Sequence, residues 1–133
     1  LYAIHSKYVD DYHDGQESII YLVASVEKIA GSDLGWCFTD GHAVEAITTF
    51  FNDPGQLKAV DWSVIRNNSW GNSMEYPDRK RKKQAEFLVK RFFPWNMVEK
   101  IGVYDTSIQK RVQEIIGGCE WQPPVEVRKY WYY

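Results

Sequence analysis

The longest uninterrupted apolar run in this chain, residues 19–24 (IIYLVA), is only six residues long. A membrane-spanning helix needs about 20 consecutive apolar residues, and the sequence offers no such segment. A short run bounded by polar positions is instead typical of one buried strand. At 133 residues the chain has the length of one domain. We therefore expect a single domain over residues 1–133 that makes no contact with a membrane.

Short segments of strand and helix periodicity follow one another along the chain, separated by turn residues. Strand patterns cover 18–24, 36–39, 84–91, 99–104 and 125–128, and helical patterns cover 25–30, 43–51, 62–65 and 106–116. In the last helix, Ile108, Val112 and Ile115 are expected to face inward. Residues 67–77 have no period and predict a long loop, which in compact domains is often functional. The mixture indicates an α+β fold, with a mixed β-sheet core, short flanking helices and an open strand order.

Charge is concentrated in one segment, although the net charge is only −2. Residues 79–91 hold seven cations and one carboxylate, whereas the other 120 residues hold nine basic and 17 acidic side chains. A cationic cluster on an anionic body indicates one localised contact with a polyanion. Aromatic residues make up 16% of the chain, and rings beside cations suit single-stranded nucleic acid because bases stack on them. The alternative is a solvated charged turn.

Glu86 follows the consecutive cations Arg79 to Lys83 by three positions and falls within the predicted strand 84–91. Strand alternation places it on one face with Gln84 and Leu88. A carboxylate at a strand centre must face water or be held for a purpose. Glu86 is therefore a candidate catalytic residue, and the alternative is an exposed edge-strand glutamate paired with a lysine.

A second candidate site is the segment 39–42 (TDGH), which ends a predicted strand. Asp-Gly is typical of a tight turn, and a histidine just beyond such a turn is well placed to reach into a cleft. The alternative is that Asp40 caps the following helix and His42 is solvated. In the long loop, Trp70 and Tyr76 are candidate rings for base stacking.

Several chemistries are disfavoured. The chain contains no GxGxxG, Walker, HExxH or GxSxG motif. A metal nuclease site would require Glu86 and Lys90 to share one metal-bound water, but on a strand these residues lie about 13 Å apart, so we expect no metal. The two cysteines lie far apart without CxxC spacing, which favours reduced thiols and a cytoplasmic protein.

Six stretches, taken in order, carry a family resemblance: 20–23 (IYLV), 25–28 (SVEK), 38–43 (FTDGHA), 78–89 (DRKRKKQAEFLV), 93–95 (FPW) and 131–133 (WYY). Together they resemble the DarT family, the DNA ADP-ribosyltransferase toxins of DarT–DarG toxin–antitoxin systems. The similarity covers essentially the whole chain, and the block 78–89 is specific.

The resemblance implies an ADP-ribosyltransferase fold, NAD+ as co-substrate, and transfer of ADP-ribose onto a base of single-stranded DNA, usually thymine, which blocks replication. Glu86 would be the catalytic glutamate, and His42 would lie near the target nucleotide. Lys80 would stand where family members can carry an arginine facing the DNA. The usual partner would be a DarG-like antitoxin whose macrodomain removes the modification. The DNA-binding loop would contain Arg79, Lys80, Arg81, Lys82 and Lys83.

Family members also carry an N-terminal part that nothing in this chain matches. That part supplies a histidine strand that holds NAD+, a loop that closes over it and a catalytic arginine, and residues 1–4 (LYAI) resemble the family just after it. We therefore expect the C-terminal portion of a DarT-like enzyme, incomplete at its N-terminus, with the NAD+-binding residues upstream of Leu1. One alternative is a catalytically incompetent fragment or relic that only binds single-stranded nucleic acid, and another is a structural or interaction domain.

Overall fold

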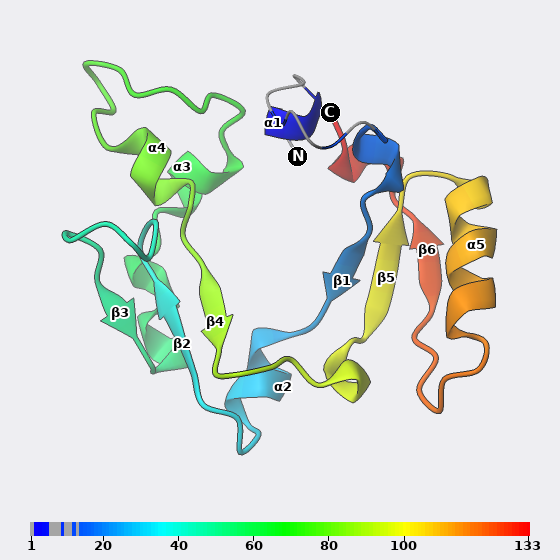
Figure 1. Ribbon diagram of the computed structural model, residues 1–133. Coiled ribbons are helices and arrows are strands. Elements are labelled where there is room, and N and C mark those ends of the chain that lie inside the picture. The colour runs from blue at the N-terminus through cyan, green and yellow to red at the C-terminus, as the bar shows by residue number, and fades with distance from the viewer. Residues whose placement is uncertain (1, 6–8, 10–11, 13) are drawn as a thin grey trace. The chain divides into compact units, whose positions relative to one another are not determined.

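A computed structural model describes residues 2–5, 9, 12 and 14–133. The chain separates into two compact units, unit 1 (residues 1–25 and 94–133) and unit 2 (residues 26–93). Each unit has its own three-stranded sheet (Figure 1). The expected α+β class is confirmed, while the single domain over 1–133 stays a prediction. None of the helices in the described residues combines the length and the apolar character needed to cross a bilayer.

Unit 1 is built on strands β1 (Tyr21–Val23), β5 (Lys100–Val103) and β6 (Val125–Val127), in the order β1-β5-β6. β1 runs antiparallel to β5, whereas β6 runs parallel to it. A parallel pair needs a crossover connection, and helix α5 (Thr106–Ile116) supplies it beside β6 (Figure 1). The unit also contains α1 (Tyr2–His5) and the 3-10 turns η1 (Gln16–Ser18), η3 (Trp95–Met97) and η4 (Lys129–Trp131).

The core of unit 1 lies where α5 packs on the sheet. Asp105 begins this helix, because its Oδ1 accepts a 2.9 Å hydrogen bond from the Ile108 N–H. The predicted inward stripe is confirmed at Val112 but is wrong at Ile115, which is 69% exposed. Ile116 takes that buried position, since four residues after Val112 bring the chain back to the same face. The clustered buried side chains are Val98, Ile101, Val103, Val112, Ile116 and Val125.

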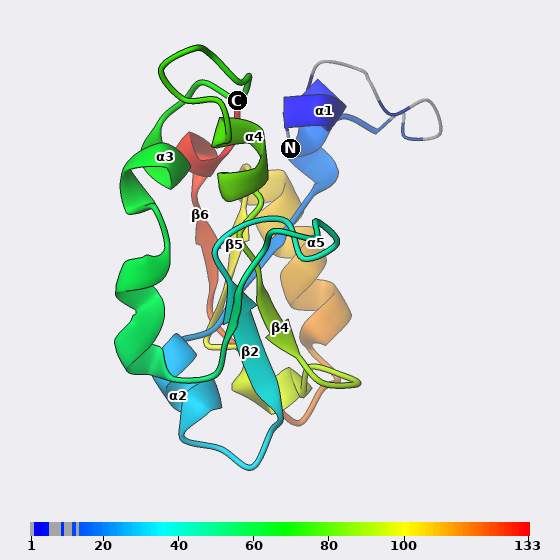
Figure 2. The same cartoon turned by 90° about the vertical axis from the view of Figure 1, so that its left-hand side faces the viewer.

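Unit 2 is built on β2 (Trp36–Thr39), which pairs antiparallel with β3 (Phe50–Phe51) and β4 (Phe87–Val89). The rings of Trp36 and Phe87, on neighbouring strands, stack with their centroids 5.3 Å apart. Figure 2 shows α3 and α4 at the end of the sheet where β2 stops and β4 starts. The helical segments of the unit are α2 (Val26–Ala30), η2 (Pro54–Ala59), α3 (Trp62–Arg66) and α4 (Arg79–Lys82).

Two predictions for unit 2 are wrong. Residues 43–51 form turns and then β3 instead of a helix, because Asp40 and Thr49 bond to each other through two hydrogen bonds of 3.3 and 3.0 Å. The predicted strand 84–91 shortens to β4, because the cations of α4 form a helical turn whose hydrogen bonds continue to residues 84 and 85. Glu86 therefore immediately precedes the strand instead of lying at its centre.

Gly102 is a close-approach position in the sheet of unit 1, and it provides a test of the packing. A Cβ on Gly102 would lie 2.3 Å from Cζ3 of Trp131, whereas a Cβ on Gly118 would meet nothing within 4 Å. We expect Gly102→Ala to lower the free energy of unfolding by about 1–3 kcal/mol, as overpacking does, in urea denaturation. Gly118→Ala is the control and should leave stability unchanged or slightly raised. Equal losses from both substitutions would contradict this packing.

Candidate active site

The candidate catalytic residues meet because β2 and β4 are neighbours in the sheet. His42 follows β2 after the Asp40-Gly41 turn, and Glu86 precedes β4, so antiparallel pairing brings both to the same end of the sheet. Nδ1 of His42 lies 3.4 Å from Oε1 of Glu86, and the two side chains are 33% and 36% exposed. The pair is therefore accessible from solvent, and its residues lie next to the ends of two paired strands.

The Nδ1 atom of His42 is shielded from solvent and has no hydrogen-bond partner among the residues that the structure describes. Its contact with Glu86 has the distance of an ion pair without the geometry of a hydrogen bond. Shielded polar atoms are nearly always paired, so this nitrogen calls for an explanation, such as strain, a catalytic role or a bound water or ion. Its shielding and its contact with a carboxylate distinguish His42 from a fully solvated surface histidine.

Thr39, the last residue of β2, links the backbones of the two candidate residues. It is fully buried, and its hydroxyl donates to the Gly41 carbonyl at 2.7 Å while accepting from the Glu86 N–H at 2.9 Å. The Thr39 N–H also donates to the Glu86 carbonyl, at 2.9 Å. One side chain therefore fixes both the turn that carries His42 and the residue that carries the carboxylate.

The lysines at the end of the cationic segment are bound to helix α3. Nζ of Lys82 lies 2.9 Å from Oδ2 of Asp61, which begins that helix. Hydrogen bonds from Ser63 and then Lys82 lower the pKa of Asp61 to about 2. Nζ of Lys83 donates to backbone carbonyls where α3 ends, including that of Ile65 at 3.0 Å. Burial, and then repulsion from a neighbouring arginine, lowers the pKa of Lys83.

Arg79 contacts the long loop, whereas Lys80 is exposed to solvent. Arg79 donates to the Gly71 carbonyl at 3.1 Å and lies 4.6 Å from the ring centre of Tyr76. Lys83 lies 5.0 Å from the ring centre of Trp70 in the same way. The side chain of Lys80 is exposed. The two rings predicted to stack on bases therefore lie against cations of the chain itself, and their contact with bases stays a prediction.

Two cavities of unit 2 lie at the His42–Glu86 pair. A polar cavity of about 380 Å³ is lined by charged and polar side chains, which are His42, Glu45, Asn72, Asp78, Lys80, Arg81 and Gln84, together with Ile47. An apolar cavity of about 220 Å³ has Glu86 in its wall beside rings such as Phe38. Because one member of the pair lines each cavity, the pair stands between a polar cavity and an apolar one.

The sequence identified both members of the pair, His42 and Glu86, and the nearby Lys80. It missed the residues whose hydrogen bonds hold them in place. Thr39 gave no signal beyond its place at the end of a predicted strand. On a helix, an aspartate and an arginine three positions apart can form an ion pair. The sequence therefore predicts the Asp78–Arg81 ion pair only once residues 79–82 are known to be helical. Within the described residues, no group of three or more histidine, cysteine or acidic side chains is arranged to hold a metal ion.

The Thr39 hydroxyl can be tested without any assay of function. Thr39→Val keeps the shape of the side chain but leaves the Gly41 carbonyl and the Glu86 N–H without this hydrogen-bond partner. We therefore expect the free energy of unfolding to fall by about 1–3 kcal/mol. Thr39→Ser keeps the hydroxyl and should lose less. Urea denaturation measures the stability, and amide hydrogen exchange at Glu86 should accelerate in the valine variant alone. Slow exchange at Glu86 in that variant would contradict the assigned bonds.

Comparison with known proteins gives the family. The family model described as "ssDNA thymidine ADP-ribosyltransferase, DarT" matches residues 1–133. A DNA ADP-ribosyl transferase of Thermus aquaticus is 45% identical over 135 residues, which cover 100% of this chain and 58% of that protein. One of Mycobacterium tuberculosis is 29% identical over 120 residues, covering 90% of this chain and 50% of the other. The chain thus spans little more than half the length of these curated relatives.

Solved structures agree with the sequence matches. Thermus sp. 2.9 DarT in complex with NAD+ is 36% identical, with a TM-score of 0.90 over 99% of this chain and 66% of the other. The same enzyme in complex with ADP-ribosylated single-stranded DNA gives 36% identity and a TM-score of 0.90, over 99% of this chain and 62% of the other. These matches confirm the expected ADP-ribosyltransferase-like fold. The chain belongs to the DarT family of single-stranded-DNA thymidine ADP-ribosyltransferases.

Proposed function

We propose that this chain supplies the catalytic carboxylate and the target-binding surface of an enzyme that transfers ADP-ribose from NAD+ to a thymine base of single-stranded DNA. The family description and the complexes of the Thermus relative with NAD+ and with ADP-ribosylated DNA support this proposal. The observation that carries it is the Glu86–His42 pair, 3.4 Å apart, standing between a polar cavity and an apolar one.

The reaction requires a carboxylate that is held in place. As the bond between the nicotinamide nitrogen and ribose C1′ breaks, nicotinamide leaves with the electron pair and C1′ becomes electron-poor, as in glycoside hydrolysis. A held carboxylate stabilises that charge more in the transition state than in the ground state. Glu86 would do so by accepting a bond from a ribose hydroxyl. It would also take the proton that the base nitrogen loses on forming its bond to C1′.

The two cavities beside the pair would bind different parts of the substrates. The polar cavity, with the exposed Lys80 and the half-exposed His42, suits a nucleotide and its phosphate. The apolar cavity beside Glu86 suits the flat face of a ring. A base in single-stranded DNA is already unpaired, so the enzyme avoids the free-energy cost of extruding it from a duplex.

The wider setting follows from the family resemblance. We infer a DarG-like antitoxin with a macrodomain as partner, a cytoplasmic location, and NAD+-binding residues upstream of Leu1. The coverage of the relatives, 58% of the Thermus aquaticus protein, is compatible with such an upstream part. Activity is therefore tested on the full-length product of the gene that contains this chain.

Glu86→Gln tests the catalytic carboxylate. The amide keeps the shape but cannot accept a proton, so we expect the rate to fall by about 10²- to 10⁴-fold while oligonucleotide affinity stays within twofold. The assay incubates the protein with NAD+ and a thymine-containing oligonucleotide and follows the mass gain of one ADP-ribose, with an oligonucleotide lacking thymine as control. If wild-type protein binds the oligonucleotide without modifying it, and NAD+ leaves the binding unchanged, the chain is a binding module instead.

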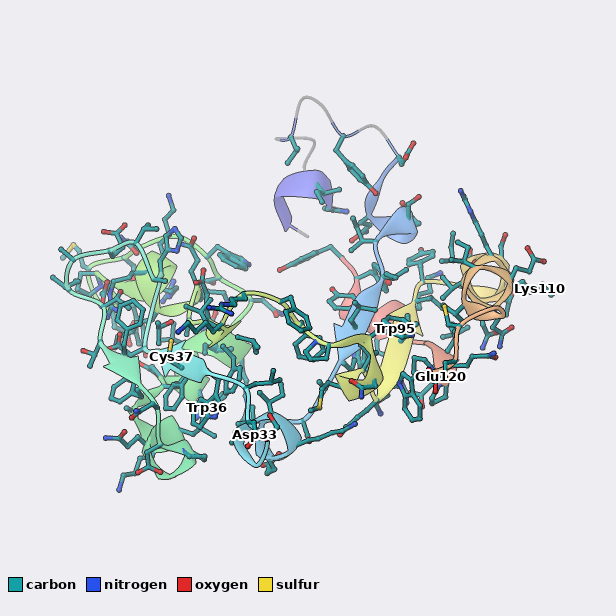
Figure 3. The ribbon with its side chains drawn as sticks, turned by 60° about the horizontal axis from the view of Figure 1, so that its bottom comes forward. Asp33, Trp36, Cys37, Trp95, Lys110 and Glu120 are labelled. Carbon is teal, nitrogen blue, oxygen red and sulfur yellow. The ribbon has the colours of Figure 1, made fainter. Side chains whose placement is uncertain are left out.

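Lys80→Gln tests the exposed cation. Removing one phosphate contact should weaken oligonucleotide binding and reduce the slope of log K against log salt by about 0.7, the value for one contact to a single strand. Lys110→Gln is the charge-matched control, because Lys110 is exposed on the side of α5 that faces away from the sheet of unit 1 (Figure 3). An equal loss of affinity in both variants would mean that binding depends on the net charge of the protein and that Lys80 makes no specific contact.

A further inference from the structure

We propose that Arg81 is a positioning residue that holds His42 beside Glu86, and that its guanidinium does not bind DNA. The inference rests on the proposed function of the Glu86–His42 pair. Arg81 lies in the middle of the cationic segment, where the sequence predicts a phosphate contact. Its side chain, however, is only 12% exposed.

Every nitrogen of the Arg81 guanidinium has a partner inside unit 2. Nε donates to both carboxylate oxygens of Asp78 at 2.9 Å, and Nη2 donates to Oδ2 of the same residue at 2.7 Å. Nη1 donates to Oδ1 of Asp40 at 3.0 Å and to the hydroxyl of Thr48 at 3.1 Å. The hydrogen bonds to Asp78, with a further one to Asp40, raise the pKa of Arg81. A DNA phosphate would have to displace two carboxylates that already neutralise this cation.

Two hydrogen bonds hold the backbone of His42, one to the backbone of Arg81 and one from Thr48, which the Arg81 guanidinium holds in turn. The His42 N–H donates to the Arg81 carbonyl at 3.0 Å. The His42 carbonyl accepts from the Thr48 hydroxyl at 2.7 Å, and that hydroxyl is itself held by Nη1 of Arg81. Asp40, the other acceptor of Nη1, accepts a 3.0 Å bond from the Thr49 N–H and so closes the loop. Arg81 is thus the shared anchor of the loop that carries His42.

Gly41 shows how closely the arginine and the turn fit. A Cβ on Gly41 would lie 2.2 Å from Nη1 of Arg81 and 2.9 Å from its Cζ. Any larger residue at position 41 must push the guanidinium away from Asp40 and Thr48. The Gly41 carbonyl accepts a 2.7 Å hydrogen bond from the Thr39 hydroxyl, and the N–H of the next residue, His42, donates to the Arg81 carbonyl at 3.0 Å. The backbone of the turn is therefore held on both sides of a substituted position 41.

The role predicted for Arg81 is therefore geometric. Without the guanidinium, Asp40 and Asp78 would face each other across the loop without their shared cation, and like charges in that position repel. His42 would then move relative to Glu86. A displacement of about 1 Å at a reacting group can lower a rate by about 100-fold, so a residue that acts through the position of His42 can still set the rate.

The test compares turnover with DNA binding in the full-length gene product. In Arg81→Lys and Thr48→Val, we expect kcat to fall at least tenfold while the KM for the oligonucleotide and the slope of log K against log salt stay unchanged. Thr48→Ser restores the hydroxyl and should restore kcat. Gly41→Ala, which displaces the guanidinium without changing any charge, should behave like Arg81→Lys. If Arg81→Lys fails to fold, Thr48→Val and Gly41→Ala carry the same test.

The opposite pattern would overturn the proposal. If Arg81→Gln reduces the salt slope as Lys80→Gln does, Arg81 contacts phosphate. If the Thr48 and Gly41 variants retain full kcat, the loop needs no anchor.

A readout that needs no turnover separates this proposal from the proposed function. Amide hydrogen exchange at His42, Thr48 and Thr49 should accelerate in Arg81→Gln and stay slow in Lys80→Gln. If wild-type protein transfers no ADP-ribose, the proposed function fails, while exchange and the salt slope still decide the role of Arg81. Unchanged exchange at these three residues in Arg81→Gln would refute the anchoring role.

Discussion

The pairing of β2 with β4 sets the position of the groups in the candidate site. Trp36 lies opposite Val89 and Phe38 opposite Phe87, and this register leaves the end of β2 beside the start of β4. Thr39 then bonds to the backbone of Glu86 and to the turn that leads to His42. A histidine and a carboxylate separated by 44 positions thereby meet at 3.4 Å. The site depends on the register of two short strands and on one buried hydroxyl.

Most of the cationic segment, residues 79–83, makes contacts inside unit 2. Lys82 and Lys83 fix α3, and Arg81 fixes the loop of His42, so most of the charge holds unit 2 together. Lys80 is left with its side chain exposed at the polar cavity. A positive segment in the sequence therefore does not give the number of cations that are free of ion pairs, because the anionic residues that neutralise it lie at distant positions such as Asp40 and Asp61.

The local signals in the sequence predicted much of the fold. The helices at 25–30, 62–65 and 106–116 are confirmed, because the signals for a short helix lie in neighbouring residues. The strand at 36–39 is also confirmed. The helix predicted at 43–51 is wrong, because bonds to Asp40 and Arg81 hold that segment in turns. The inward orientation of the Arg81 side chain could not be predicted from the sequence either, because one of its partners, Asp40, lies 41 positions away.

The central claim is that the Glu86 carboxylate lies at the ribose carbon that changes its bond. A crystal structure of the full-length Glu86→Gln protein with NAD+ and a thymine-containing oligonucleotide tests it most directly. The account predicts the side-chain amide of residue 86 within hydrogen-bond reach, about 3 Å, of a ribose hydroxyl next to C1′, with the target base beside His42. A ribose bound elsewhere, with residue 86 facing only solvent, would contradict it.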